Sequence, residues 1–108
     1  GNSPKNVFVQ DMAVAFETGN VSPGSVTEDL SLHDPSDTSS VALQRPFAWL
    51  INQPAPIEIH VVHAIAHGRT GASNGFSKLE DGSTRHFSYI FEFKNTTAKC
   101  ISVVYRYS

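Results

Sequence analysis

The chain has 108 residues, 40% of them hydrophobic, and a formal net charge of −2 at pH 7. This length predicts one domain with a single hydrophobic core. The charge balance argues against nucleic-acid binding, because a basic surface is lacking. No apolar run approaches the roughly 20 residues of a membrane-spanning helix, and no signal peptide is visible. Cys100 is the single cysteine, so we expect no internal disulfide and a cytoplasmic location.

The first predicted element is an amphipathic helix that begins at Ser3-Pro4 and ends at Gly19-Asn20. A serine hydroxyl can cap free N–H groups, and proline is favoured at the first helical position. Glycine commonly ends a helix in the left-handed conformation. The spacing predicts that one apolar stripe lies on a sheet. Its members are Val7, Phe8, Met12, Ala15 and Phe16.

The middle of the chain predicts short elements separated by turns. Residues 21–26 are rich in helix breakers and allow at most one helical turn. Residues 27–33 alternate as a short half-buried strand, which a turn over residues 34–37 closes. Residues 40–43 are a second short strand or extended chain. A second helix is predicted over residues 46–52, with Pro46 in its first turn, where proline is tolerated.

The second half of the chain predicts an antiparallel meander of four strands, at residues 57–68, 69–79, 86–94 and 99–107. Tight turns join such strands, and Asp81-Gly82 reaches positive φ at low cost. In the third strand Phe87, Tyr89, Phe91 and Phe93 share one face by the two-residue period. In the fourth, Ile101, Val103, Tyr105 and Tyr107 are predicted to face the same side. Helices on one face of an antiparallel sheet make an α+β architecture. Strong twist curves such a sheet into a cone whose interior is open at one end.

His63 and His67 are the candidate polar groups of the first meander strand. They are predicted to share a face with Ile59, Val61 and Ile65. Four strand residues span about 13 Å, so the two imidazoles cannot bind one metal ion. We therefore expect neither a metal nor a cofactor. Each histidine is either bonded to a neighbour or to solvent, or is a polar group of a pocket that changes charge near neutral pH.

The order of elements resembles the nuclear transport factor 2-like (cystatin-like) superfamily, which includes ketosteroid isomerases and SnoaL-type polyketide cyclases. The most specific part is residues 67–75, continuing through Asp81-Gly82 to residues 87–93. It is similar to the strand-turn-strand core of small bacterial SnoaL-like proteins. Leu-Ser-Leu-His-Asp-Pro at residues 30–35 resembles the strand-end Asp-Pro of ketosteroid isomerases. The resemblance implies a cone-shaped α+β domain over residues 1–108, an interior pocket, and a homodimer formed through the outer sheet face.

The resemblance also implies roles for individual residues. The family's catalytic aspartate falls on Asp34, and its pocket aromatic of the last strand falls on Tyr107. Met12 stands where the isomerases have a tyrosine donor, and Tyr89 where they have a protonated aspartic acid. Asp34 would act as general base and Tyr89 as hydrogen-bond donor, whereas Met12 supplies no donor, which weakens an isomerase assignment. Alternatively, Asp34 belongs to a solvated turn and caps its own backbone.

The sequence thus predicts a domain that binds a small hydrophobic molecule. If the domain is an enzyme, it is expected to be an isomerase, cyclase or dehydratase. The expected catalytic residues are Asp34 and Tyr89, and the expected ligand-binding residues are His63, His67, Phe91, Tyr107 and Met12. The alternative is a non-catalytic binding or dimerisation module whose interior is filled by side chains. Interior volume separates the two, because small-molecule pockets measure about 300–1,000 Å³.

Overall fold

The structure is a computed structural model that describes residues 3–33, 54–97 and 99–107. The described elements are α1 (Pro4–Thr18), the 3₁₀ turn η1 (Pro23–Ser25) and the strands β1 (Val26–His33), β2 (Glu58–His67), β3 (Thr70–Lys78), β4 (Thr84–Phe93) and β5 (Ile101–Tyr107). Asp34, the possible strand at 40–43 and the predicted helix at 46–52 lie outside the described residues.

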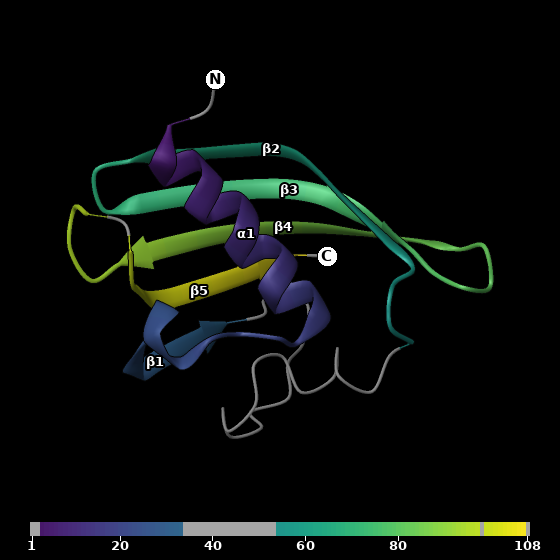
Figure 1. Ribbon diagram of the computed structural model, residues 1–108, viewed down its shortest axis with the longest axis horizontal. Helices are drawn as coiled ribbons and strands as arrows, with labels where there is room; N and C mark the ends of the chain where they lie inside the picture. Colours follow the sequence, from purple (N-terminus) through teal and green to yellow (C-terminus); the bar gives the residue numbers. More distant parts are fainter. Residues whose placement is uncertain (1–2, 34–53, 98, 108) are drawn as a thin grey trace.

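The five strands form one mixed sheet in the order β1-β5-β4-β3-β2 (Figure 1). β2 to β5 pair antiparallel in chain order, which confirms the predicted meander. β1 pairs in parallel with β5 at the sheet edge. α1 crosses one face of the sheet diagonally, and β1 lies at the edge remote from β2 (Figure 1). We call the face under α1 the inner face and the opposite face the outer face.

α1 begins and ends as predicted. The Ser3 side chain accepts a hydrogen bond from the backbone N–H of Asn6 at 3.3 Å, and Gly19 closes the helix at φ 73°. The buried stripe differs, because Val9 and Ala13 are fully buried whereas Val7 is 43% exposed. The predicted position of Val7 in the stripe is therefore wrong.

The aromatic face of β4 lies on the inner side, as the alternation predicted. Phe87, Tyr89, Phe91 and Phe93 are all buried there. Phe16 of α1 packs over two of these rings, with its centroid 5.9 Å from those of both Tyr89 and Phe91. This contact fixes the last turns of α1 over the middle of the sheet.

β5 departs from the predicted alternation because a β-bulge lies near its start. Ile101 pairs with Phe93, but Val103 pairs with Glu92, so one extra residue, Ser102, stands between them. An extra residue reverses which face every later side chain occupies. Val104 and Arg106 are consequently buried on the inner face. The prediction that Val103, Tyr105 and Tyr107 face inward is wrong.

A second bulge in β2 has the same effect on the histidines. Val61 pairs with Gly75 and His63 pairs with Asn74, so Val62 is the extra residue. Before the bulge, Ile59 and Val61 pack against the core, and after it Ala64 and Ala66 do so. His63 and His67 therefore share the outer face with Ile65, whereas Ile59 and Val61 face inward. The predicted common face holds only beyond the bulge.

Candidate functional site

A buried group of charged and polar side chains lies on the inner face, and we call it the inner cluster. It consists of Glu17, Arg85, Tyr89 and Arg106. The Arg106 Nε atom lies 2.8 Å from Glu17 Oε2, and the Tyr89 hydroxyl donates to the same oxygen at 2.5 Å. Arg106 Nη2 donates to Glu17 Oε1 at 3.4 Å, and Arg106 Nε lies 3.2 Å from the Tyr89 hydroxyl.

Three elements bring the inner cluster together. Glu17 stands in the last turn of α1, next to the buried Phe16. The alternation of β4 turns Arg85 and Tyr89 to the inner face. Arg106 is the direct cross-strand partner of Tyr89, and the bulge at Ser102 gives it the same face. Residues far apart in the chain thus meet at one place.

Arg85 contacts this group at its edge. Its Nε lies 3.5 Å from Glu17 Oε1, and its side chain is 13% exposed. Within the described residues, Arg85 Nε and Nη1 are buried without a hydrogen-bond partner. The inner cluster therefore holds two guanidinium groups and one carboxylate.

The electrostatics of the inner cluster raise the pKa of both Tyr89 and Arg106. Burial raises the pKa of Tyr89 well above its ordinary value, and the negative charge of Glu17 raises it further. Burial alone would lower the pKa of Arg106, but its hydrogen bond to Glu17 and its contacts with Tyr89 raise it overall. Tyr89 is consequently a neutral donor and Arg106 a permanent cation, which suits binding and orientation of a ligand.

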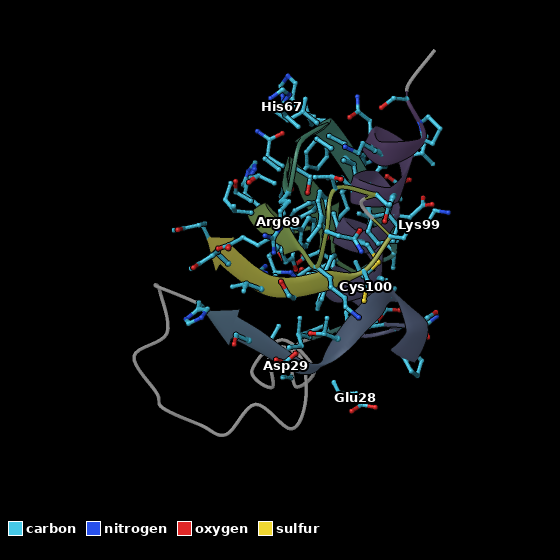
Figure 2. The ribbon with its side chains drawn as sticks, turned by 90° about the vertical axis from the view of Figure 1, so that its left-hand side faces the viewer. Glu28, Asp29, His67, Arg69, Lys99 and Cys100 are labelled. Carbon is cyan, nitrogen blue, oxygen red and sulfur yellow. The ribbon has the colours of Figure 1, made fainter. Side chains whose placement is uncertain are left out.

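The structure separates the predicted site residues into two groups. Met12, Tyr89 and Phe91 belong to the inner core, where Tyr89 and Phe91 stack with centroids 5.5 Å apart. His63 and Tyr107 are exposed or partly exposed on the outer face. His67 ends β2, and Figure 2 shows it on the side of the sheet away from α1. One interior pocket therefore cannot hold all of them.

Sequence reasoning missed Glu17, Arg85 and Arg106. Arg85 is in phase with Phe87 and Tyr89, so the period of β4 was a signal for it. Glu17 lies four residues after the buried Ala13, the helical spacing of one face. Arg106 had no such signal, because the bulge at Ser102 is not visible in the alternation.

The outer face carries two adjoining hollows. The larger has a volume of about 470 Å³ and is lined in part by Val62, Asn74, Phe76, His86, Ser88 and Tyr107. The smaller, of about 160 Å³, shares Asn74 and Ser88 and adds His63, Ile65, Ala72 and Ser73. Both are shallow. His63 Nδ1 lies 2.9 Å from Asn74 Oδ1, so this imidazole is bonded within the face.

Rings also line this face. The His60 ring stacks on Phe76 with centroids 4.9 Å apart, and His86 lies on the other side of Phe76 at 6.1 Å. At the far edge His33 stacks on Tyr105 at 4.9 Å. Within residues 3–33, 54–97 and 99–107, no group of three or more His, Cys, Asp and Glu side chains could hold a metal ion. In the same ranges, no helix has the length and apolar character needed to cross a membrane.

Comparisons with known proteins identify the fold. No protein-family model matches the chain, and no curated protein sequence matches it significantly. A similar solved structure is the designed protein named "Rd1NTF2_04 with long sheet", with a TM-score of 0.60 and 13% sequence identity. The match covers 93% of this chain and 96% of the designed one. At this identity the likeness concerns the fold alone. The chain therefore has the nuclear transport factor 2-like α+β fold, as the sequence resemblance predicted.

Proposed function

We propose that the chain binds a small molecule on the inner side of the sheet, with the inner cluster as the polar anchor. The observation that carries this proposal is the complete burial of the Glu17–Arg106 ion pair together with the Tyr89 hydroxyl. Apolar side chains of similar volume are often at least as stabilising as a buried ion pair. Strongly perturbed, buried titratable groups gather at functional sites more often than elsewhere.

Each residue of the anchor has a distinct task in this proposal. Tyr89 donates a hydrogen bond, Arg106 supplies a fixed positive charge, and Glu17 holds both in place. Phe91 and Met12 form the apolar wall beside them. In the catalytic version, an isomerase, cyclase or dehydratase, Asp34 supplies the general base and Tyr89 turns its hydroxyl from Glu17 to the substrate oxygen.

The three tyrosines of the chain make a direct test possible. Tyr89 lies on the inner face, whereas Tyr105 and Tyr107 lie on the outer face. Protein labelled with 3-fluorotyrosine gives one fluorine signal for each, assigned with single Tyr→Phe variants. Titration with a set of small hydrophobic compounds should shift the Tyr89 signal and leave the Tyr107 signal in place, with a parallel rise in the melting temperature.

Other outcomes separate the alternatives. Shifts confined to Tyr105 and Tyr107 would place the ligand in the outer hollows, where His63 and Tyr107 would bind it. If no compound moves any signal, the domain is the filled, non-catalytic module and the proposal fails. Asp34→Asn tests the catalytic version separately, because loss of turnover with unchanged binding is the signature of a missing base.

For the assembly, the proposal is a homodimer through the outer face. Val62, Ile65 and Tyr107 expose 56%, 63% and 44% of their surfaces there. Tyrosine and other aromatic side chains are enriched at protein interfaces. The outer face therefore has exposed apolar and aromatic side chains, together with polar groups that can pair with a second copy of the chain.

A further inference from the structure

The outer face carries every histidine of the chain. The five are His33 of β1, His60, His63 and His67 of β2, and His86 of β4, and the strand register turns each of them away from α1. We infer that the proposed dimer is a pH-sensitive assembly, which forms while His63 and His86 are neutral and separates when they take up protons. This inference rests on the proposed function, because it states how the proposed dimer is regulated.

Permanent charges lie at the two ends of the described outer face, and histidines lie between them. Glu58 and Lys78 are direct cross-strand partners at one end. Glu92 pairs with Thr70 at the other end, next to Arg69 of the β2–β3 turn. The remaining titratable groups of this face are the histidines, Tyr105 and Tyr107, with Glu28 and Asp29 exposed at the β1 edge (Figure 2). Because tyrosine titrates at about pH 10, the imidazoles are the groups in the middle of the face that can gain charge near neutral pH.

This charge pattern suits a second copy of the chain as the partner. A two-fold interface brings the same patch of both copies together, so a face with a large charge of one sign would repel itself. While the imidazoles are neutral, the carboxylates of Glu58 and Glu92 are balanced by Lys78 and Arg69. Protonated histidines would give both copies an excess of positive charge at the same place.

His63 and His86 are the histidines that the proposed interface covers. His86 lines the larger hollow of the outer face with Val62 and Tyr107, and His63 lines the smaller one with Ile65. Val62, Ile65 and Tyr107 are the exposed side chains on which the proposed dimer depends. Both imidazoles therefore lose contact with water when a second copy covers the two hollows.

The other three histidines are less suited to control the dimer. His60 Nε2 lies 3.0 Å from Glu58 Oε2, so a positive charge on this ring is balanced within the same copy. His33 and His67 are the last residues of β1 and β2, at the margin of the sheet. Protonation of these three changes the charge of the interface less than protonation of His63 and His86.

Covering an imidazole couples its protonation to dissociation of the dimer. An imidazole in water takes up a proton at about pH 6.5. Burial disfavours the charged form, and like charges on the two copies repel each other. The hydrogen bond between His63 Nδ1 and Asn74 Oδ1, 2.9 Å long, forms with a neutral or a charged ring and supplies no counter-charge. The separated copies therefore bind protons more readily than the dimer does, and acid favours them.

Sedimentation velocity over a concentration series at about pH 7.5 and about pH 5.5 tests this, because carboxylates of ordinary pKa stay ionised in that range. We expect the dissociation constant to be at least about a hundredfold higher at the lower pH. Each buried imidazole contributes about tenfold per pH unit below its pKa in the separated copy, and the two copies bring at least one each. Circular dichroism at both pH values should show the same folded chain.

Histidine variants identify the groups responsible. In the double variant His63→Gln/His86→Gln, the dissociation constant should change by less than about threefold between the two pH values, because glutamine does not titrate. The double variant His33→Gln/His67→Gln removes the same number of imidazoles from the margin of the sheet. It is the matched control and should keep the wild-type response to pH.

The outcomes separate the two proposals. A wild type that is monomeric at both pH values would overturn the proposed dimer and this inference with it. A dimer of equal strength at both pH values would overturn the inference alone, as would a pH response that survives in His63→Gln/His86→Gln. If that variant does not fold or dimerise, the wild type decides: the pH at which half the dimer separates should fall as protein concentration rises, and a midpoint independent of concentration contradicts the coupling.

Discussion

At the scale of single residues, Glu17 balances the charge of the interior. Its carboxylate contacts Tyr89, Arg85 and Arg106, and the glutamate is 2% exposed. Removing one partner of a buried ion pair costs more than removing both, because the remaining charge stays uncompensated. The contribution of the inner cluster to stability therefore depends on Glu17 more than on any surface charge.

Glu17→Gln should lower the free energy of unfolding by about 3–5 kcal/mol, because both guanidinium groups lose their counter-charge. Urea unfolding at neutral pH measures this. Glu58→Gln is the matched control and should leave stability unchanged, since Glu58 pairs with His60 on the exposed surface. In the double variant Glu17→Gln/Arg106→Met, the Arg106→Met substitution should restore most of the free energy of unfolding that Glu17→Gln removes. A double variant as unstable as the sum of the single ones would contradict the assigned pairing.

Tyr89 should control the alkaline limit of stability. Its pKa is raised in the folded state by burial and by Glu17, so the folded protein keeps a proton that the unfolded chain releases near pH 10. Its contribution is complete below the unfolded pKa and is lost as pH rises through the folded pKa. The free energy of unfolding should fall more steeply with pH in the wild type than in Tyr89→Phe.

Urea titrations between about pH 8 and pH 11.5 measure this difference in slope. Tyr107→Phe, at a partly exposed outer-face position, should keep the wild-type slope. Equal slopes in the wild type and Tyr89→Phe would mean that the phenol is not buried against Glu17.

At the scale of elements, the approach of α1 to the sheet depends on the missing side chain of Gly71. A Cβ at this position would lie 2.6 Å from Val9 Cγ2 and 2.8 Å from Phe93 Cζ. Gly71→Ala should therefore cost about 1–3 kcal/mol of unfolding free energy, through overpacking. Gly24→Ala, where nothing lies within 4 Å, is the control and should be close to neutral. Adding Val9→Ala to Gly71→Ala should recover part of the lost free energy of unfolding. Thermal unfolding of these three variants and the wild type checks it.

Because Ser102 is the extra residue of the bulge, we expect the fold to tolerate its deletion. Without Ser102, Ile101, Val103 and Val104 would continue a regular ladder and keep their present faces, because the extra residue alone is removed. The hydrogen bond from the Ser102 hydroxyl to the Glu92 carbonyl would be lost. Deleting Tyr105 instead would turn Arg106 to the outer face and break its ion pair with Glu17.

We expect the Ser102 deletion to fold with the Tyr89 fluorine signal near its wild-type position. The Tyr105 deletion should lose about 3–5 kcal/mol, the cost of a broken buried pair. Urea unfolding compares the two. If both deletions are equally destabilising, the assigned register of β5 is wrong.

These bulges also show what the sequence could and could not predict. The caps of α1, the aromatic face of β4 and the turn at Gly82 follow from local residue chemistry, and they were predictable. Val62 and Ser102 carry no such mark, because either residue fits a regular strand equally well. Each one reverses the faces beyond it, and so His63 and Tyr107 were assigned to the wrong sides. The bulge at Ser102 is the reason that Arg106 was missed as a partner of Glu17 and Tyr89.

At the scale of the whole molecule, the proposed dimer places the outer face of one copy against that of another. Ile65→Glu should raise the dissociation constant at least about tenfold, because a charge would be buried in the interface. Ile57→Glu is a matched control: Ile57 is equally exposed, at 63%, and precedes β2. Sedimentation velocity over a concentration series measures both. A monomeric wild type, or dissociation by Ile57→Glu alone, would contradict this interface.

The parallel pairing of β1 with β5 sets an order in which the sheet can open. β1 sits at the edge and has β5 as its neighbour, whereas β5 is held on both sides (Figure 1). β1 can detach while the meander stays intact, but β5 cannot detach without releasing β1. Amide protons of β1 should therefore exchange with deuterium sooner than those of β5, and those of β3 and β4 last. We therefore expect the pairing of β1 with β5 to open before the pairing of β5 with β4.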